Sequence, residues 1–209
     1  MTNIKKNKFK VGYDPSPNSI LTWDETNSYW KGDGTMWDDL RVVPGVLDRP
    51  GNNDPVIRTW QPGGGGTTFY VWGFPASKEG FFTCQLPHGY LEGSDIKMHT
   101  HWSPGADGVG ENGHTVAWKL DYSWANTDAA FPVSATADMT DACSGTNHLH
   151  EISPEVTVSG TGKTVSSMLV CRFYRDSGDS WVGSGNPILL EFDIHIQMDA
   201  VGSRTSLAK

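Results

Sequence analysis

Two histidines separated by a single residue are the feature of this sequence best suited to chemistry. Residues 93–101 read Gly-Ser-Asp-Ile-Lys-Met-His-Thr-His, so His99 and His101 fall on one face if this segment is a β-strand. Two imidazoles on one strand face can chelate a divalent metal ion, and His114 follows nearby in the sequence. A metal centre is therefore one hypothesis for this segment.

The spacing of Gly93, His99 and His101 also matches the opening of the cupin metal-binding motif, but the rest of that motif is missing. Cupins place a glutamate three or four residues after the second histidine. None of the five residues after His101 is acidic, and Asp107 and Glu111 lie farther along. The second cupin motif has no convincing match downstream. A cupin-like metalloenzyme is therefore the weakest of the functional hypotheses.

The favoured interpretation of the same strand is a solvated sheet face on which polar side chains pair across neighbouring strands. On this interpretation Lys97 and Lys119 lie opposite acidic residues. We expect no catalytic residue, no cofactor and no catalytic metal. His99 and His101 would form a structural site at most.

Other candidate reactive residues lack the context that catalysis requires. The sequence contains no Gly-x-Ser-x-Gly, phosphate-loop or His-Glu-x-x-His motif, and the glycine run at residues 63–66 lacks the lysine of a phosphate cradle. Cys84 and Cys171 lie among apolar residues, so both are predicted to be buried, unreactive thiols. His148 and His150 flank a leucine in a predicted turn or strand edge.

The elements that position these residues are predicted from alternation of apolar and polar side chains. Residues 115–124 and 188–198 alternate with a period of two, which is typical of half-buried antiparallel strands. Glycine-rich turns separate further strands, and no crossover helix is predicted. The further strands are residues 67–72, 81–86, 95–102, 155–159 and 165–175. The residues predicted to face the core are Val116, Trp118, Leu120, Phe192, Ile194 and Ile196.

The fold predicted from this pattern is all-β, an antiparallel β-sandwich of jelly-roll type. Residues 1–60 lack sustained alternation, although they contain Trp23, Trp30, Trp37 and Trp60. We therefore expect an extended, irregular N-terminal arm over residues 1–60, which is not an independent domain, and a sandwich domain over residues 61–209.

Composition and charge narrow the possible partners. The chain of 209 residues has a formal net charge of −8, and its first ten residues carry four lysines and no acid. The rest of the chain is therefore strongly acidic and unsuited to nucleic acid. Three cysteines without a Cys-x-x-Cys pair indicate a reducing compartment. Neither a signal peptide nor a membrane span is expected, because no long apolar segment is present.

Several phrases of the sequence together resemble a family of virion proteins encoded by tailed bacteriophages. They span residues 37–198 and are specific in combination, although each is weak alone. The phrases are Trp37-Asp-Asp-Leu-Arg with Pro44, Leu86-Pro-His-Gly-Tyr with Glu92-Gly-Ser-Asp-Ile, His99-Thr-His-Trp-Ser-Pro, Trp118-Lys-Leu-Asp-Tyr-Ser-Trp-Ala-Asn, and Ser166-Ser-Met-Leu-Val-Cys-Arg-Phe-Tyr-Arg-Asp.

The resemblance implies a structural virion protein, namely a trimeric jelly roll that decorates and stabilises a capsid (a cement protein). Its partners would be its own copies and the major capsid protein or other virion proteins. It would be assembled in the host cytoplasm and would lie on the capsid surface, with no contact to membranes or nucleic acid. A head- or tail-fibre protein that binds a receptor or glycan is the alternative. Such a protein would use exposed aromatic residues in the loops at residues 104–113 or 174–187. The resemblance implies no catalytic residue.

Overall fold

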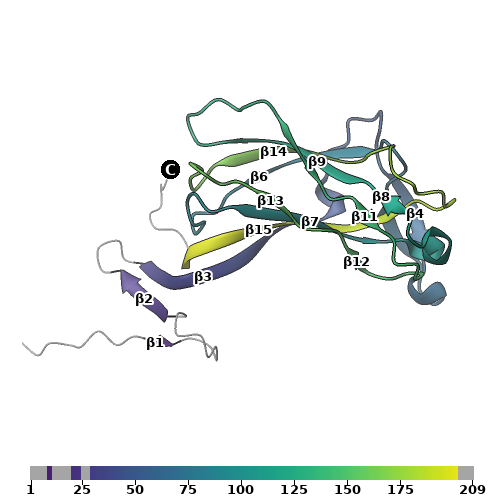
Figure 1. Ribbon diagram of the computed structural model, residues 1–209, viewed down its shortest axis with the longest axis horizontal. Coiled ribbons are helices and arrows are strands. Elements are labelled where there is room, and N and C mark those ends of the chain that lie inside the picture. The colour runs from purple at the N-terminus through teal and green to yellow at the C-terminus, as the bar shows by residue number, and fades with distance from the viewer. Residues whose placement is uncertain (1–8, 11–19, 25–28, 202–209) are drawn as a thin grey trace, which may run out of the picture.

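The computed structural model describes the backbone at residues 9–10, 20–24 and 29–201, and the side chains of residues 36–200. Within these residues two antiparallel sheets face each other (Figure 1). A nine-stranded sheet forms one layer, a four-stranded sheet forms the other, and a two-stranded ribbon lies at one end. The predicted all-β antiparallel sandwich is therefore confirmed.

The large sheet is organised around its last strand, β15 (Ile188–Val201). The strands β3 (Tyr29–Val42) and β5 (Phe69–Gly73) pair along one edge of β15, and β7 (Ile96–Ser103) pairs along the other edge. The remaining strands of this sheet are β1 (Phe9–Lys10), β2 (Ile20–Asp24), β4 (Val56–Trp60), β12 (Glu151–Ile152) and β13 (Val156–Val158).

The small sheet has the order β10 (Ala135–Asp138), β9 (Trp118–Ala125), β14 (Met168–Arg175) and β6 (Glu79–Gln85). The short ribbon consists of β11 (Asp141–Ala142) and β8 (Thr115–Val116). Three 3-10 helices connect strands: η1 (Pro44–Val46), η2 (Pro62–Gly64) and η3 (Gly105–Glu111). None of the described helices is long and apolar enough to cross a membrane.

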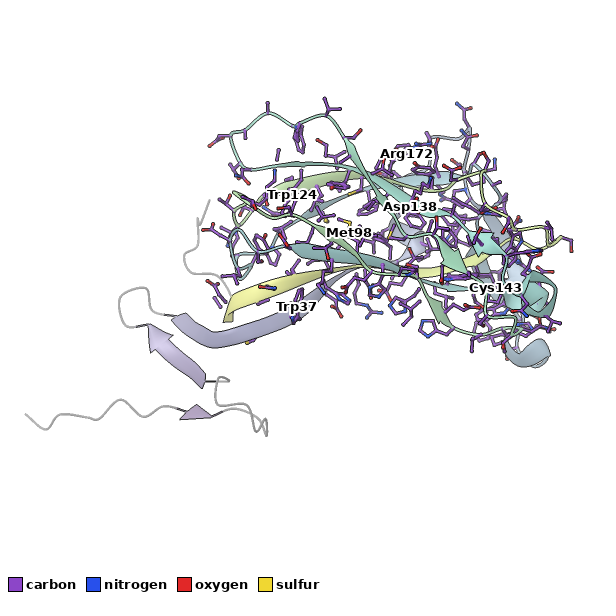
Figure 2. The ribbon with its side chains drawn as sticks, viewed as in Figure 1. Trp37, Met98, Trp124, Asp138, Cys143 and Arg172 are labelled. Atoms are coloured by element: carbon purple, nitrogen blue, oxygen red, sulfur yellow. The ribbon has the colours of Figure 1, made fainter. Side chains whose placement is uncertain are left out.

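The core lies between the two layers and is rich in aromatic side chains. All six residues predicted to face it are buried, with at most 1% of their surface exposed. The rings of Trp118 and Phe173 stack with centroids 5.5 Å apart, and Phe74 meets both rings edge-on. Met98 of β7 points into this space between the layers (Figure 2). The alternation of the sequence therefore identifies the core-facing side of the strands correctly.

The N-terminal sixty residues differ from the predicted arm where the structure describes them. Residues 29–42 form β3, which pairs with β15 from Val42↔Phe192 to Trp30↔Val201, and residues 56–60 form the edge strand β4. Alternation is weak there because residues 29–39 contain few aliphatic side chains, so the sequence gives little signal for this strand. Of the predicted basic tip at residues 1–10, only the backbone of residues 9–10 is described, and the rest lies outside the described residues.

Replacing Phe192 with alanine should destabilise the fold by about 3–5 kcal/mol, because a large side chain is removed from a packed core. Phe192 is 1% exposed, and its ring lies 5.7 Å from that of Phe82 and 5.6 Å from that of Phe173. The free energy of unfolding can be measured by urea denaturation. Phe131→Ala is the matched control, because Phe131 is 51% exposed and should lose little stability. Equal losses for both variants would contradict this packing.

Candidate functional site

Polar side chains from three adjacent strands gather on the outer side of the large sheet. Because side chains alternate across a strand, the burial of Ile194 and Phe192 on β15 directs Asp193 and His195 to the other side. The register then places Asp193 opposite His99 of β7. We call this surface the histidine face. Its residues are Asp39, Arg41, Lys97, His99, His101, His150, Glu155, Glu191, Asp193 and His195.

Three side chains meet at the centre of the histidine face. The Nε2 atoms of His99 and His101 are 2.9 Å apart. The Oδ2 atom of Asp193 lies 3.1 Å from Nε2 of His101 and 3.8 Å from Nε2 of His99. The side chains of His99 and Asp193 are only 8% and 9% exposed, whereas that of His101 is 20% exposed. Two imidazoles and one carboxylate thus direct a ligand atom each toward one point near the surface.

Further histidines surround this central trio. Nε2 of His150 lies 2.7 Å from Nδ1 of His101, so the ring of His101 is held on both of its nitrogens. The ring of His195 meets that of His99 edge-on, with centroids 4.6 Å apart. Nε2 of His195 lies 3.4 Å from an oxygen of Asp39. Four imidazoles therefore lie in one connected array over β7, β15 and the loop before β12.

The cationic side chains of the face are paired with acids other than Asp193. Nζ of Lys97 contacts Glu155 at 2.6 Å and also lies 5.3 Å from the ring centre of Trp37, which is on the outer side of this layer (Figure 2). The guanidinium of Arg41 contacts Glu191 at 2.6 Å through both Nε and a terminal nitrogen. The predicted pairing of Lys97 with an acid is present.

The environment of His99 favours its neutral form. Burial lowers the pKa of His99, and the neighbouring His195 and His101 lower it further, while Asp193 and Glu155 oppose this effect. The neutral imidazole has a free nitrogen lone pair, which is the form that binds metal ions. The centre of the face is therefore chemically suited to hold a cation.

The structure separates the other predicted candidates from this centre. His114 contacts Glu111 at 3.2 Å instead of joining the other histidines. Nδ1 of His148 accepts a hydrogen bond from the indole of Trp60 at 2.9 Å. Asp193 was not identified as a partner of the histidine pair from sequence. The alternation at residues 188–198 marks it as outward-facing, but only the register between β15 and β7 brings it to His99.

The three cysteines are free thiols, of which Cys143 and Cys171 are buried and Cys84, predicted to be buried, is partly exposed. The thiol of Cys143 is hydrogen-bonded to Glu151 and to the carbonyl of Gly108. Burial raises the pKa of Cys84 to about 12 and that of Cys143 to about 11, and it also raises the pKa of Cys171. A thiol becomes nucleophilic only as the thiolate, so none is activated near neutral pH.

A surface hollow of about 450 Å³ lies between β3 and β6. Its lining residues are Asp39, Leu40, Arg41, Val42, Val46, Asp48, Phe82, Thr83 and Cys84. The hollow contains no histidine, and its thiol has a raised pKa. It therefore presents no activated nucleophile.

No protein-family model matches the chain, and no curated protein sequence matches it. Weak structural likeness extends to a Paenibacillus sp. cycloisomaltooligosaccharide glucanotransferase, with 14% identity, a TM-score of 0.37, and coverage of 73% of this chain and 18% of that one. Bacteriophage CBA120 tailspike protein 4 gives 8% identity, a TM-score of 0.33, and coverage of 79% and 19%. The structure of infectious bursal disease virus Gx strain gives 10% identity and a TM-score of 0.35, with coverage of 90% of this chain and 36% of that one. The chain thus spans less than two-fifths of each of these chains, and likeness at this level does not bear on function.

Alkylation should distinguish the native chain from the unfolded one. At pH 8 a thiol with a pKa near 11 is ionised in only about one molecule in a thousand. The native protein should therefore react slowly with iodoacetamide, and Cys143 should react faster as the pH rises toward 11. The chain unfolded in urea should gain three adducts, as read by intact mass. Rapid modification of a native thiol at pH 8 would contradict the assigned environments.

Proposed function

We propose that this chain is a non-enzymatic structural protein of a tailed bacteriophage particle, acting as a trimeric decoration protein on the capsid surface. One observation carries the proposal. The blocks around Trp37 and His99, which resemble phage virion proteins, flank the same strand and meet on the outward histidine face. Residues that serve only packing would face the core instead. The residues that resemble phage virion proteins therefore include some on the outer surface of the sheet.

The reactive groups support a non-enzymatic role. The three thiols have raised pKa values, and burial is the largest cause in each case. The histidines lie on a sheet surface and are engaged with one another and with acids. A protein that stabilises a shell requires such a rigid scaffold and no activated nucleophile. Its partners on this proposal are its own copies and the major capsid protein, assembled together in the host cytoplasm.

An open sheet edge supports a closed oligomer. Among the described strands, β4 pairs only with β5, so its other edge offers unpaired backbone groups. Apolar side chains on this hairpin are exposed, including Ile57 at 61%, Phe69 at 51% and Tyr70 at 78%. Open edges and exposed apolar surface are typical of protein contacts, and a cyclic oligomer covers them on every copy.

The loops at residues 104–113 and 174–187, where a glycan-binding protein would expose aromatic residues, do not favour that alternative. In the loop before β15, the indole of Trp181 donates a hydrogen bond to the carbonyl of Gly185 at 2.9 Å and packs against Trp102. The large apolar side chains exposed in the two loops are the aliphatic Val109 and Val182. These aliphatic groups lack the flat ring on which a sugar stacks.

Placing a charge on the open edge should dissociate the oligomer. Ile57→Asp should convert a trimer into a monomer in light scattering, because an unpaired carboxylate would be buried at the contact. Val133→Asp is the matched control, since Val133 is 94% exposed and lies in the loop before β10. It should keep the trimeric mass. A monomeric wild-type protein at micromolar concentration would contradict the trimer.

Antibodies against the chain should label the heads of particles produced by the phage or prophage that encodes it. Electron microscopy of immunogold-labelled particles would locate the protein directly. Label confined to the tail tip would instead support the alternative of a receptor-binding fibre protein. Unlabelled particles, with the protein recovered only in the soluble fraction, would contradict a virion role altogether.

A further inference from the structure

The central trio of the histidine face has the dimensions of a metal site. The three ligand atoms are separated by 2.9, 3.1 and 3.8 Å, and a circle through such points has a radius of about 1.9 Å. An ion about 0.8 Å out of their plane would therefore lie about 2.1 Å from each atom, the distance at which Zn²⁺ and similar ions bind nitrogen and oxygen.

The carboxylate of Asp193 is only partly engaged by the residues around it. Asp193 is only 6% exposed, and its Oδ1 atom has no hydrogen-bond partner among the described residues. The nearby cations Arg41 and Lys97 are in contact with Glu191 and Glu155. A buried carboxylate oxygen without a partner is costly, and a bound divalent ion would supply that partner.

The donor types indicate the class of ion. Two imidazole nitrogens and one carboxylate oxygen suit transition metals such as zinc, iron, cobalt or manganese better than calcium, which prefers oxygen ligands throughout. His150 supports His101 through its second ring nitrogen, as outer residues commonly do for metal-bound histidines. Three protein ligands also leave positions for water.

Two other sets of three residues on the face are less suitable. In the set of His99, Glu155 and His195, the carboxylate already holds Lys97. In the set of Asp39, Asp193 and His195, the side chain of Asp39 is 51% exposed. The trio of His99, His101 and Asp193 is the best-shielded of the three sets and is free of a competing lysine.

We propose that His99, His101 and Asp193 bind one divalent transition-metal ion per chain on the outer face of the large sheet. The ion would tie β7 to β15 and act as a structural clamp. The inference rests on the side chains of a single chain, so it stands independently of the proposed virion role.

The test uses untagged full-length protein that has been stripped with a chelator and dialysed. Titration with Zn²⁺ in a calorimeter should give one site per chain, and Co²⁺ should give a visible absorption spectrum characteristic of nitrogen and oxygen ligands. Asp193→Asn and His101→Gln should each weaken binding by more than about 100-fold, since even outer-sphere substitutions commonly cost 10–100-fold. His150→Ala, an outer-sphere change, should cost within that 10–100-fold range.

His114→Gln is the matched control, because His114 contacts a carboxylate but lies outside the trio. It should bind Zn²⁺ with wild-type affinity. Circular dichroism would confirm that each variant is folded, and His101→Gln is the variant best tolerated because its side chain is partly exposed. Absence of binding by the wild type, or unchanged affinity in folded His101→Gln, would overturn the proposal. One ion per three chains would overturn it as well, since that site would be shared between subunits.

Discussion

The structure depends on the position of β15 at the centre of the large sheet. This strand pairs with β3 and β5 on one side and with β7 on the other, so all three are ordered by one segment. Its alternation places Phe192 and Ile194 in the core and Asp193 and His195 outside. A shift of one residue would exchange the two faces, burying charge and exposing the aromatic core. Core packing therefore fixes the register that builds the histidine face.

Local features of this fold can be predicted from the sequence, whereas contacts between residues far apart along the chain cannot. Alternation is local, and it predicted both the buried residues of β9 and β15 and the shared face of His99 and His101. The pairing of β7 with β15 joins residues that are nearly a hundred positions apart, and no local pattern encodes it. Asp193 could therefore be recognised as outward-facing but not as a neighbour of His99. Strand β3 could not be predicted because residues 29–39 show too little alternation to mark a strand.

The location of the trio at the centre of the face, and not at its rim, also has a physical basis. At the rim, Lys97 and Arg41 have long, flexible side chains that reach Glu155 and Glu191 while staying partly in water. Asp193 has a short side chain on the central strand and cannot reach solvent in the same way. Its surroundings are imidazoles, which supply nitrogen lone pairs when neutral. The ion-pair partners of Asp193 among the described residues are therefore His101 and His99.

The small sheet provides an internal comparison. On its outer face, Arg172 contacts Glu79 at 2.5 Å and Asp121 at 2.9 Å, and Lys119 lies 3.1 Å from Asp176. Each of these acids has a basic partner on a neighbouring strand or loop. The same scaffold can therefore neutralise acids with lysine and arginine. At Asp193 it presents His99 and His101 instead, which are the ion-pair partners of this carboxylate among the described residues. The proposed divalent ion would give Asp193 the cationic partner that the acids of the small sheet have in lysine and arginine.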